Sequence, residues 1–195
     1  MVLGTVLVLT ALSLFILNQK EAKQAQASVE RILPQVIQYT ENRLAESENQ
    51  SEDSDYPDLY ESEMTEVEID GYGYIGYLSI PALDLDLPVM SEWDYDRLKI
   101  APCRYAGSTK TDDLVVAAHN YTRHFGKLSK LLPGDPIYFI DMDGIRFNYE
   151  VVEVDVLSSA DIEEMVSGEY DLTLFTCTYG GQSRVTVRCD RVEDR

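Results

Sequence analysis

The sequence predicts a mainly β fold, a closed barrel of seven or eight short strands with short helices. An N-terminal membrane-spanning helix and a stalk precede it. Two observations predict the barrel. Short runs rich in β-branched and aromatic residues recur between residues 74 and 189, and turn signals separate them in place of long helical patterns. A third observation, an uncharged apolar run at the N-terminus, predicts the membrane span.

The apolar run extends from Val2 to Leu17 and contains no charged residue. At about 1.5 Å of rise per residue, a helix of this length is near the lower limit for crossing a bilayer. A cleaved signal peptide is the alternative, because Ala25-Gln26-Ala27 has the small-x-small form of a cleavage site. That site lies well past the apolar run, and no basic residue precedes the run, so we favour one uncleaved span.

The charges beside the span bear on its orientation. Lys20, Lys23 and Arg31 follow it, and by the positive-inside rule they place the body of the chain in the cytoplasm. The cysteine motif described below favours the opposite orientation, and a native chain that begins upstream of Met1 would reconcile the two.

A stalk and a linker are expected between the span and the barrel. Apolar residues recur at helical spacing and predict a stalk helix, which Pro34 would kink or restart: Val29, Ile32, Leu33, Val36 and Ile37. From Glu41 to Asp70 the chain is strongly acidic and cannot bury enough apolar surface to order itself, which predicts a linker. The expected domains are therefore residues 1–19, 20–71 and 72–195.

The barrel strands follow in order. Alternation or continuous apolar character predicts strands at Tyr74–Ile80, Leu85–Met90, Asp113–Ala118, Pro136–Asp141, Ile145–Leu157, Leu172–Cys177 and Arg184–Cys189. Met142-Asp143-Gly144 is a hairpin signal between two of them. Helical turns are expected within Ser91–Ile100 and Asp161–Val166, and a short helix with an apolar face is expected from Phe125 to Leu132.

Charge and cysteine content exclude several classes of function. The formal charge of −19 argues against nucleic-acid binding and against a polybasic contact with anionic lipid. The three cysteines, Cys103, Cys177 and Cys189, have no metal-like spacing, so we expect neither a metal nor a cofactor. Outside the cell one thiol would stay free while the other two pair or remain buried. Cys189 lies in the apolar phase of its strand, which predicts a packed thiol.

The most informative stretch surrounds Cys177. A buried strand ends at this cysteine, Gly180-Gly181 allows a sharp turn, and Arg184 begins the next strand. A thiolate is the nucleophilic form of cysteine, and a histidine near its reference pKa of about 6.5 can take and return the proton. An arginine stays charged and can stabilise an oxyanion. The pattern therefore indicates nucleophilic catalysis on a carbonyl.

Thr173-Leu174-Phe175-Thr176-Cys177 with Arg184 downstream resembles the Thr-Leu-x-Thr-Cys signature and strand arginine of the sortases, membrane-anchored cysteine transpeptidases of mainly Gram-positive bacteria. The resemblance extends to His119, which ends an apolar run, and to Gly76-Tyr77-Leu78-Ser79-Ile80-Pro81, and covers roughly residues 72 to 192. It implies a sortase-type barrel.

The resemblance also implies roles for three residues. Cys177 would attack a threonine-adjacent bond in a sorting signal and form a thioester, His119 would transfer protons, and Arg184 would stabilise the oxyanion. His124 competes with His119, but it lies in a polar loop and is expected to be solvated. Arg188 and Arg191 compete with Arg184, which lies nearest the turn and the cysteine.

The partners implied are secreted proteins with a C-terminal sorting signal and an amine acceptor such as a peptidoglycan precursor or a pilin lysine. The implied location is the cell membrane, crossed once, with the catalytic domain outside. Two alternatives stay open from the residues alone: a membrane-tethered cysteine protease that uses water as acceptor, and a non-catalytic extracellular adhesion or scaffold domain.

Some features bear on the subclass. Asn120 after the histidine resembles class B-like members, whereas the interval from Cys177 to Arg184 is shorter than in most of the family and predicts a small groove wall. Some pilin-assembling sortases carry an aspartate-proline-aromatic lid, but Asp55-Tyr56-Pro57-Asp58 has a different order, so no lid is expected here. A groove is expected to be lined by Tyr179, Tyr121 and Trp93, although Trp93 also suits core packing.

Overall fold

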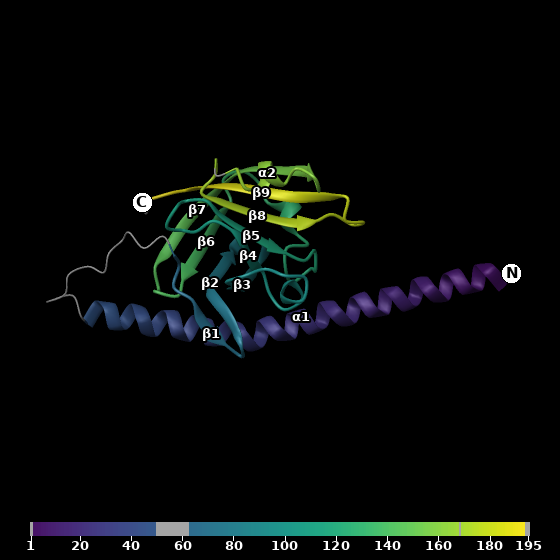
Figure 1. Ribbon diagram of the computed structural model, residues 1–195, viewed down its shortest axis with the longest axis horizontal. Coiled ribbons are helices and arrows are strands. Elements are labelled where there is room, and N and C mark those ends of the chain that lie inside the picture. Colours follow the sequence, from purple (N-terminus) through teal and green to yellow (C-terminus); the bar gives the residue numbers. More distant parts are fainter. Residues whose placement is uncertain (1, 50–62, 168, 194–195) are drawn as a thin grey trace.

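A computed structural model describes residues 2–49, 63–167 and 169–193 of the chain. One long helix, α1 (Val2–Asn49), runs along one side of a β-barrel, and its N-terminal part projects well beyond the barrel (Figure 1). The strands are β1 (Val67–Ile69), β2 (Tyr72–Ile80), β3 (Leu85–Met90), β4 (Cys103–Ala106), β5 (Leu114–Ala118), β6 (Pro136–Asp141), β7 (Arg146–Ser158), β8 (Leu172–Cys177) and β9 (Ser183–Arg191).

The sheet closes on itself. Its strand order is β1-β2-β3-β4-β5-β8-β9-β7-β6, and β6 also pairs with β2, so the eight strands from β2 to β9 form a closed barrel. β1 adds a short antiparallel ladder to the start of β2. Most neighbouring strands are antiparallel, but β5 and β8 are parallel, and so are β3 and β4. The predicted closed, mainly β barrel is confirmed.

Closure depends on a glycine in β2. Gly76 has φ of +144°, lies at a register shift in the β2–β3 ladder and pairs with Asp141 of β6. A Cβ at this position would collide with the carbonyl oxygen of Ile140, so only glycine lets the two backbones approach. The close approach at Gly76 therefore allows β2 to pair with β6, which is the pairing that closes the barrel.

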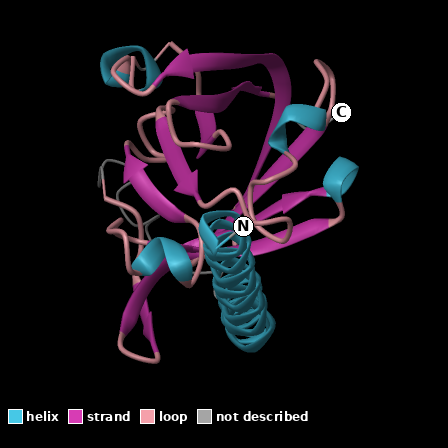
Figure 2. Ribbon diagram, turned by 90° about the vertical axis from the view of Figure 1, so that its right-hand side faces the viewer, coloured by secondary structure: helices cyan, strands magenta, loops and turns pink. Residues whose placement is uncertain are grey.

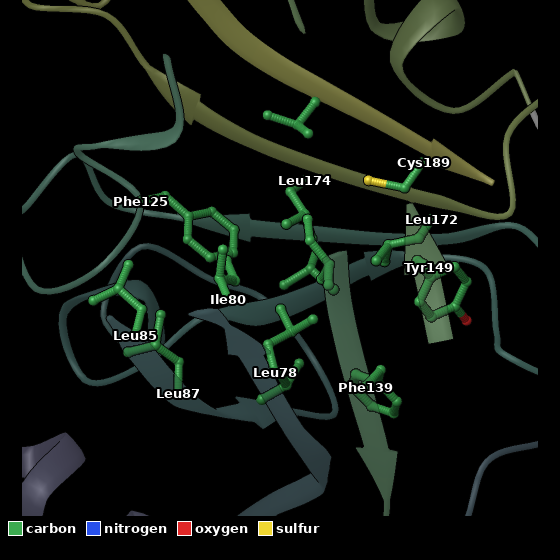
Figure 3. Close-up of a cluster of buried hydrophobic side chains, with 14 of the residues drawn as sticks. Leu78, Ile80, Leu85, Leu87, Phe125, Phe139, Tyr149, Leu172, Leu174 and Cys189 are labelled. Carbon is green, nitrogen blue, oxygen red and sulfur yellow. The ribbon is translucent and has the colours of Figure 1, made fainter. Parts of the chain in front are cut away.

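The barrel encloses the main apolar core (Figure 3). Alternate residues of most strands point inward, as the period of two requires, and among the largest fully buried ones are Leu78, Ile80, Leu87, Leu114, Phe139 and Tyr149. Phe125, from the loop after β5, joins them in the core. A second cluster lies outside the barrel, where Ile32 and Val36 of α1 pack against Tyr74, Met90 and Cys103. The stalk part of α1 is thus held on the barrel by burial of its apolar stripe, and Figure 2 looks along this helix.

Several local expectations are corrected. α1 continues through Pro34 without interruption and reaches Asn49, so the first part of the acidic segment is helical, and β1 forms near its end. Residues 50–62, including Asp55-Tyr56-Pro57-Asp58, lie outside the described residues. The helix expected from Phe125 to Leu132 is only a 3₁₀ turn, Leu128–Lys130. Phe125 and Leu128 are buried in the barrel core while Leu132 is exposed, so these residues do not form one apolar helix face.

The other short elements follow the sequence more closely. A 3₁₀ turn, η2 (Arg97–Lys99), occurs within the segment expected to contain one, and the short helix α2 (Ile162–Met165) precedes β8. A further 3₁₀ turn, η1 (Pro81–Leu83), joins β2 to β3. β4 was not expected, since its four residues show no clear alternation in the sequence.

Candidate active site

Cys177 and Arg184 are directly opposed residues of the antiparallel pair β8–β9. The turn between them is short and well bonded: the Thr178 amide donates to the Ser183 carbonyl at 2.9 Å, and the Ser183 amide donates to the Thr178 hydroxyl at 3.2 Å. Gly180 and Gly181 have φ of +94° and +73°, the left-handed conformation that this turn requires. The hairpin therefore fixes the cysteine and the arginine side by side at the end of the barrel.

His119 reaches the same place from β5. The parallel register pairs Ala118 with Thr176, so the next residues, His119 and Cys177, leave their strands as neighbours. The Thr176 hydroxyl donates to the Ala118 carbonyl at 2.8 Å and ties the two strand ends together. The structure thus brings His119, Cys177 and Arg184 to the ends of three adjacent strands, β5, β8 and β9.

The Cys177 and Arg184 side chains also share a face of the sheet. Leu172 and Leu174 point into the barrel core, so the alternate residues Phe175 and Cys177 point outward. Arg184 opposes Cys177 and takes the same outward face. This places Cys177 and Arg184 on the outer face of the barrel, where both are partly exposed.

The His119 imidazole lies in a largely buried setting. Burial lowers its pKa, an effect that Glu21 opposes and Lys99 reinforces. Within the described part of the chain, its Nε2 is buried and has no hydrogen-bond partner. The ring packs against Tyr121, with ring centroids 4.9 Å apart and planes 35° apart. An imidazole in this setting favours its neutral form, which is the form that accepts a proton.

His124 corrects an expectation. It was expected to be solvated, but its side chain is 0% exposed, and its pKa is lowered to about 4, first by burial and then by the proximity of His119. The loop folds back tightly, since the amides of His124 and Gly126 both donate to the Tyr121 carbonyl. His124 is therefore a buried neutral histidine that packs against the Tyr121 ring.

The two arginines of β9 have different surroundings. The Arg184 guanidinium is partly exposed and donates through Nη1 to the carbonyls of Gly181 at 3.0 Å and Ser183 at 3.1 Å. Arg188 shares its strand face but is 4% exposed, and it donates to the carbonyls of Glu164 and Met165 and to the Thr173 hydroxyl. Arg188 therefore fastens α2 to the barrel. Arg191 pairs with Asp112 at 2.9 Å, away from the site.

The other two thiols are buried. Cys189 lies in the barrel core, as expected of a packed thiol, and Cys103 lies under α1. Burial raises the pKa of Cys103 to about 12 and raises that of Cys189 as well. All three cysteines are free, and Cys177 is the one that solvent reaches.

A row of aromatic rings leads away from the cysteine strand. Phe175 contacts Tyr105 edge to face at 5.1 Å, and Tyr105 contacts Trp93 at 5.0 Å. Trp93 and Tyr105 also line a surface cavity of about 350 Å³, with Arg104 and Glu92 on its wall. Of the expected groove residues, Trp93 is partly exposed here, Tyr179 is 94% exposed on the β8–β9 turn, and Tyr121 is packed over the histidines.

Helix α1 contributes a contact that no local pattern in the sequence indicates. The Tyr121 hydroxyl donates to Glu21 Oε2 at 3.5 Å, although the two residues are 100 positions apart. Glu21 lies just past the apolar run, in a stretch that gave no functional signal. Only the packing of α1 on the barrel brings this carboxylate to the site.

Comparison with known proteins agrees with this architecture. The sortase-domain family model matches residues 78–192, more than half of the chain. Sortase C from Streptococcus pneumoniae superposes with a TM-score of 0.59 at 24% identity, over 85% of this chain and 96% of that one. A lid mutant of sortase A from Corynebacterium diphtheriae gives 0.56 at 26% identity, over 62% and 71%. Sortase C1 from Streptococcus suis gives 0.53 at 28%, over 63% and 74%.

No curated protein matches the chain by sequence. Together, the matched domain and the closed barrel decide the identity of the fold. The chain belongs to the sortase family, whose members are cysteine transpeptidases.

Proposed function

We propose that this chain is a membrane-anchored sortase that cleaves a threonine-adjacent peptide bond in the sorting signal of a secreted protein and transfers the acyl group to an amine. The observation that carries the proposal is the pairing of Cys177 with Arg184 across β8 and β9, with His119 leaving β5 beside Cys177. Enzymatic acyl transfer uses a nucleophile, a proton carrier and a group that stabilises the oxyanion, and a fixed cation can be that third group.

In the first half-reaction, Cys177 attacks the carbonyl carbon while His119 accepts the thiol proton. The carbonyl electron pair moves onto oxygen, and the resulting oxyanion lies against the Arg184 guanidinium. Both observed bonds of Arg184 use Nη1, and its Nε and Nη2 carry the other three donor hydrogens. Collapse of the oxyanion breaks the carbon–nitrogen bond, and His119 returns its proton to the leaving amine, which leaves a thioester on Cys177.

In the second half-reaction, an incoming amine attacks the thioester. His119 accepts a proton from this amine, the new amide forms, and the sulfur leaves and recovers a proton from His119. The burial that lowers the pKa of His119 favours the neutral imidazole with which both half-reactions begin. The acceptor is a primary amine of a peptidoglycan precursor or of a pilin lysine.

The substrate peptide lies beside Tyr105 and Trp93, which are accessible next to the cysteine strand. Phe175 is 7% exposed and packs edge to face against Tyr105, so the rings of Tyr105 and Trp93 offer the apolar contacts to side chains beside the scissile bond. The adjoining cavity gives these side chains room. These apolar contacts would hold the peptide so that its reacting carbonyl lies against the Cys177 sulfur.

Helix α1 supplies the anchor. Among the described residues, one helix is long and apolar enough to cross a membrane, and its apolar part is not packed inside the protein. We infer that the apolar run from Val2 to Leu17 spans the cell membrane once, with the barrel on the extracellular side. This location gives the enzyme access to secreted proteins and to cell-wall amines.

The test is a transfer assay with the full chain in detergent micelles. A pool of peptides with one fixed threonine and randomised neighbours is incubated with and without triglycine, and products are identified by mass spectrometry. We expect a triglycine-ligated product that Cys177→Ala abolishes and Cys103→Ala, which removes a buried thiol, retains. Hydrolysis alone would identify a protease, and transfer at full rate by Cys177→Ala would overturn the proposal.

A further inference from the structure

Helix α1 touches the loop that carries the proposed catalytic histidine. Glu21 lies four residues beyond Leu17, the end of the apolar run. Its Oε2 accepts a hydrogen bond from the Tyr121 hydroxyl, with 3.5 Å between the two oxygens. Tyr121 is 8% exposed, so this contact is made at the edge of a packed interface. Figure 1 shows α1 passing along the barrel before its N-terminal part projects outward. The anchor helix is therefore in contact with the active-site loop.

Tyr121 links this contact to His119. The two rings lie 4.9 Å apart at 35°, and Tyr121 also packs against His124, with ring centroids 5.6 Å apart. The backbone holds this arrangement, because the Tyr121 carbonyl accepts the amides of His124 and Gly126 and the His119 carbonyl accepts the amide of Phe125. The position of the Tyr121 ring thus limits the positions open to the His119 ring.

We propose that Glu21 and Tyr121 are positioning residues for His119, and that the membrane-anchor helix thereby forms part of the active site. This inference rests on the proposed function for the role of His119 in proton transfer. Within the described residues, the buried Nε2 of His119 has no hydrogen-bond partner that would orient the ring. The His119 ring is instead positioned by its contact with Tyr121, whose hydroxyl is held by Glu21.

The charges around His119 give Glu21 a second effect. Burial lowers the pKa of His119, the Glu21 carboxylate on α1 raises it, and Lys99 on η2 lowers it. Tyr121 and His124 face the ring from its own loop, and Cys177 neighbours it from β8. A carboxylate near an imidazole that must become cationic during the reaction stabilises the imidazolium. Glu21 therefore both orients the histidine and favours its protonated form.

The test uses the full chain in detergent micelles with the Glu21→Gln variant. Glu30→Gln is the matched control, because it makes the same charge change on an exposed face of α1, where Glu30 accepts a bond from Gln26. The chain has two histidines, so imidazole-labelled NMR resolves both titrations without any assay of activity. We expect Glu21→Gln to move the His119 titration to lower pH and Glu30→Gln to leave it in place.

Kinetics give a second measurement. Glu21→Gln keeps an acceptor for the Tyr121 hydroxyl but replaces a charged oxygen by a neutral amide oxygen, and the weaker bond predicts a drop of about threefold to tenfold in kcat/KM. In Glu21→Gln, the limb of the pH–rate profile that depends on His119 should also shift to lower pH. Tyr121→Phe keeps the ring but removes the hydroxyl, so Glu21→Gln should reduce kcat/KM less in the Tyr121→Phe background than in the wild type, a non-additivity that a double-mutant cycle measures.

An unchanged His119 titration in Glu21→Gln would overturn the inference, as would fully additive losses in the cycle. These outcomes are separable from failure of the proposed function. If no peptide is transferred by the wild type, the proposed function fails while the NMR titration still decides whether Glu21 acts on His119.

Discussion

Thr173 and Arg188 oppose each other on β8 and β9, four positions along the same strands from Cys177 and Arg184. The two arginines therefore share a face of one hairpin but have different partners. Arg188 is buried against the carbonyls of α2, whereas Arg184 donates to the carbonyls of Gly181 and Ser183 and pairs with Cys177 across the strands. Position along one strand thus separates an arginine that holds the fold together from one that is available to a substrate.

Substitution of these arginines separates the two roles. Arg184→Ala should lower kcat about 10²- to 10³-fold, as loss of an oxyanion donor typically does, and leave the unfolding midpoint nearly unchanged. Arg188→Ala should lower the free energy of unfolding by about 1–3 kcal/mol, because it leaves buried carbonyl oxygens without a hydrogen-bond donor. Steady-state transfer and urea unfolding of both variants check this. The assignment fails if Arg188→Ala proves the more damaging change to kcat in a folded protein.

The three thiols should differ in reactivity. Cys177 is partly exposed, while Cys103 and Cys189 are buried with raised pKa values, so only Cys177 should react with iodoacetamide in the folded chain at pH 7.5. Peptide mapping of the labelled protein identifies the site, and labelling in urea should recover all three. Rapid modification of Cys189 in the folded protein would contradict the core that the structure describes.

Asp141 should make stability depend on pH. Its carboxylate is 2% exposed, and burial raises its pKa from 3.8 to about 6, against the lowering effect of the amides of Ile145 and Asp143. The folded state therefore binds the proton more tightly, and the resulting stabilisation is complete below about pH 4 and lost as pH rises through about 6.

Asp141→Asn keeps an Oδ1 acceptor for both amides but cannot titrate. Relative to this variant, the wild type should gain about 2 kcal/mol between pH 7.5 and pH 4. His124 acts in the opposite sense, because its lowered pKa removes stability as pH falls below 6.5, but it is common to both proteins and cancels in the difference. Parallel stability curves from urea unfolding would show that Asp141 does not titrate as described.

Gly126 should be intolerant of a side chain. A Cβ there would collide with the carbonyl oxygen of Asn120, in the loop that carries His119 and Tyr121. Gly126→Ala should therefore displace this loop and reduce kcat/KM by about tenfold or more, since small misplacements of reacting groups are costly. Ser129→Ala, an exposed change in the next turn, serves as the control. Equal activity of the two variants would mean that the loop position does not govern catalysis.

Much of the fold could be predicted from the sequence, because the signals involved are local. Alternating strands, the hairpin at Met142-Asp143-Gly144 and the turn at Gly180-Gly181 each depend on neighbouring residues, and all occur as expected. β4 was missed because its pairing with β5 contains a register shift and its sequence shows no clear alternation.

Residues of the candidate site could be predicted from the sequence where they lie at the ends of strands. They could not be predicted where their position depends on packing between distant segments. Cys177 and Arg184 could be placed together from a strand–turn–strand pattern, and His119 from the end of an apolar run. The burial of His124 could not, because it depends on a loop folding back over the barrel end. The contact of Glu21 with Tyr121 likewise arises only when α1 packs on the barrel.

The intact mass of the protein after incubation with the threonine-anchored peptide pool tests the central claim most directly. We predict a covalent adduct equal to the N-terminal part of a cleaved peptide, located on Cys177, released by triglycine and missing from Cys177→Ala. Peptide turnover by the wild type without any adduct on Cys177, or an equal adduct on Cys177→Ala, would contradict the account.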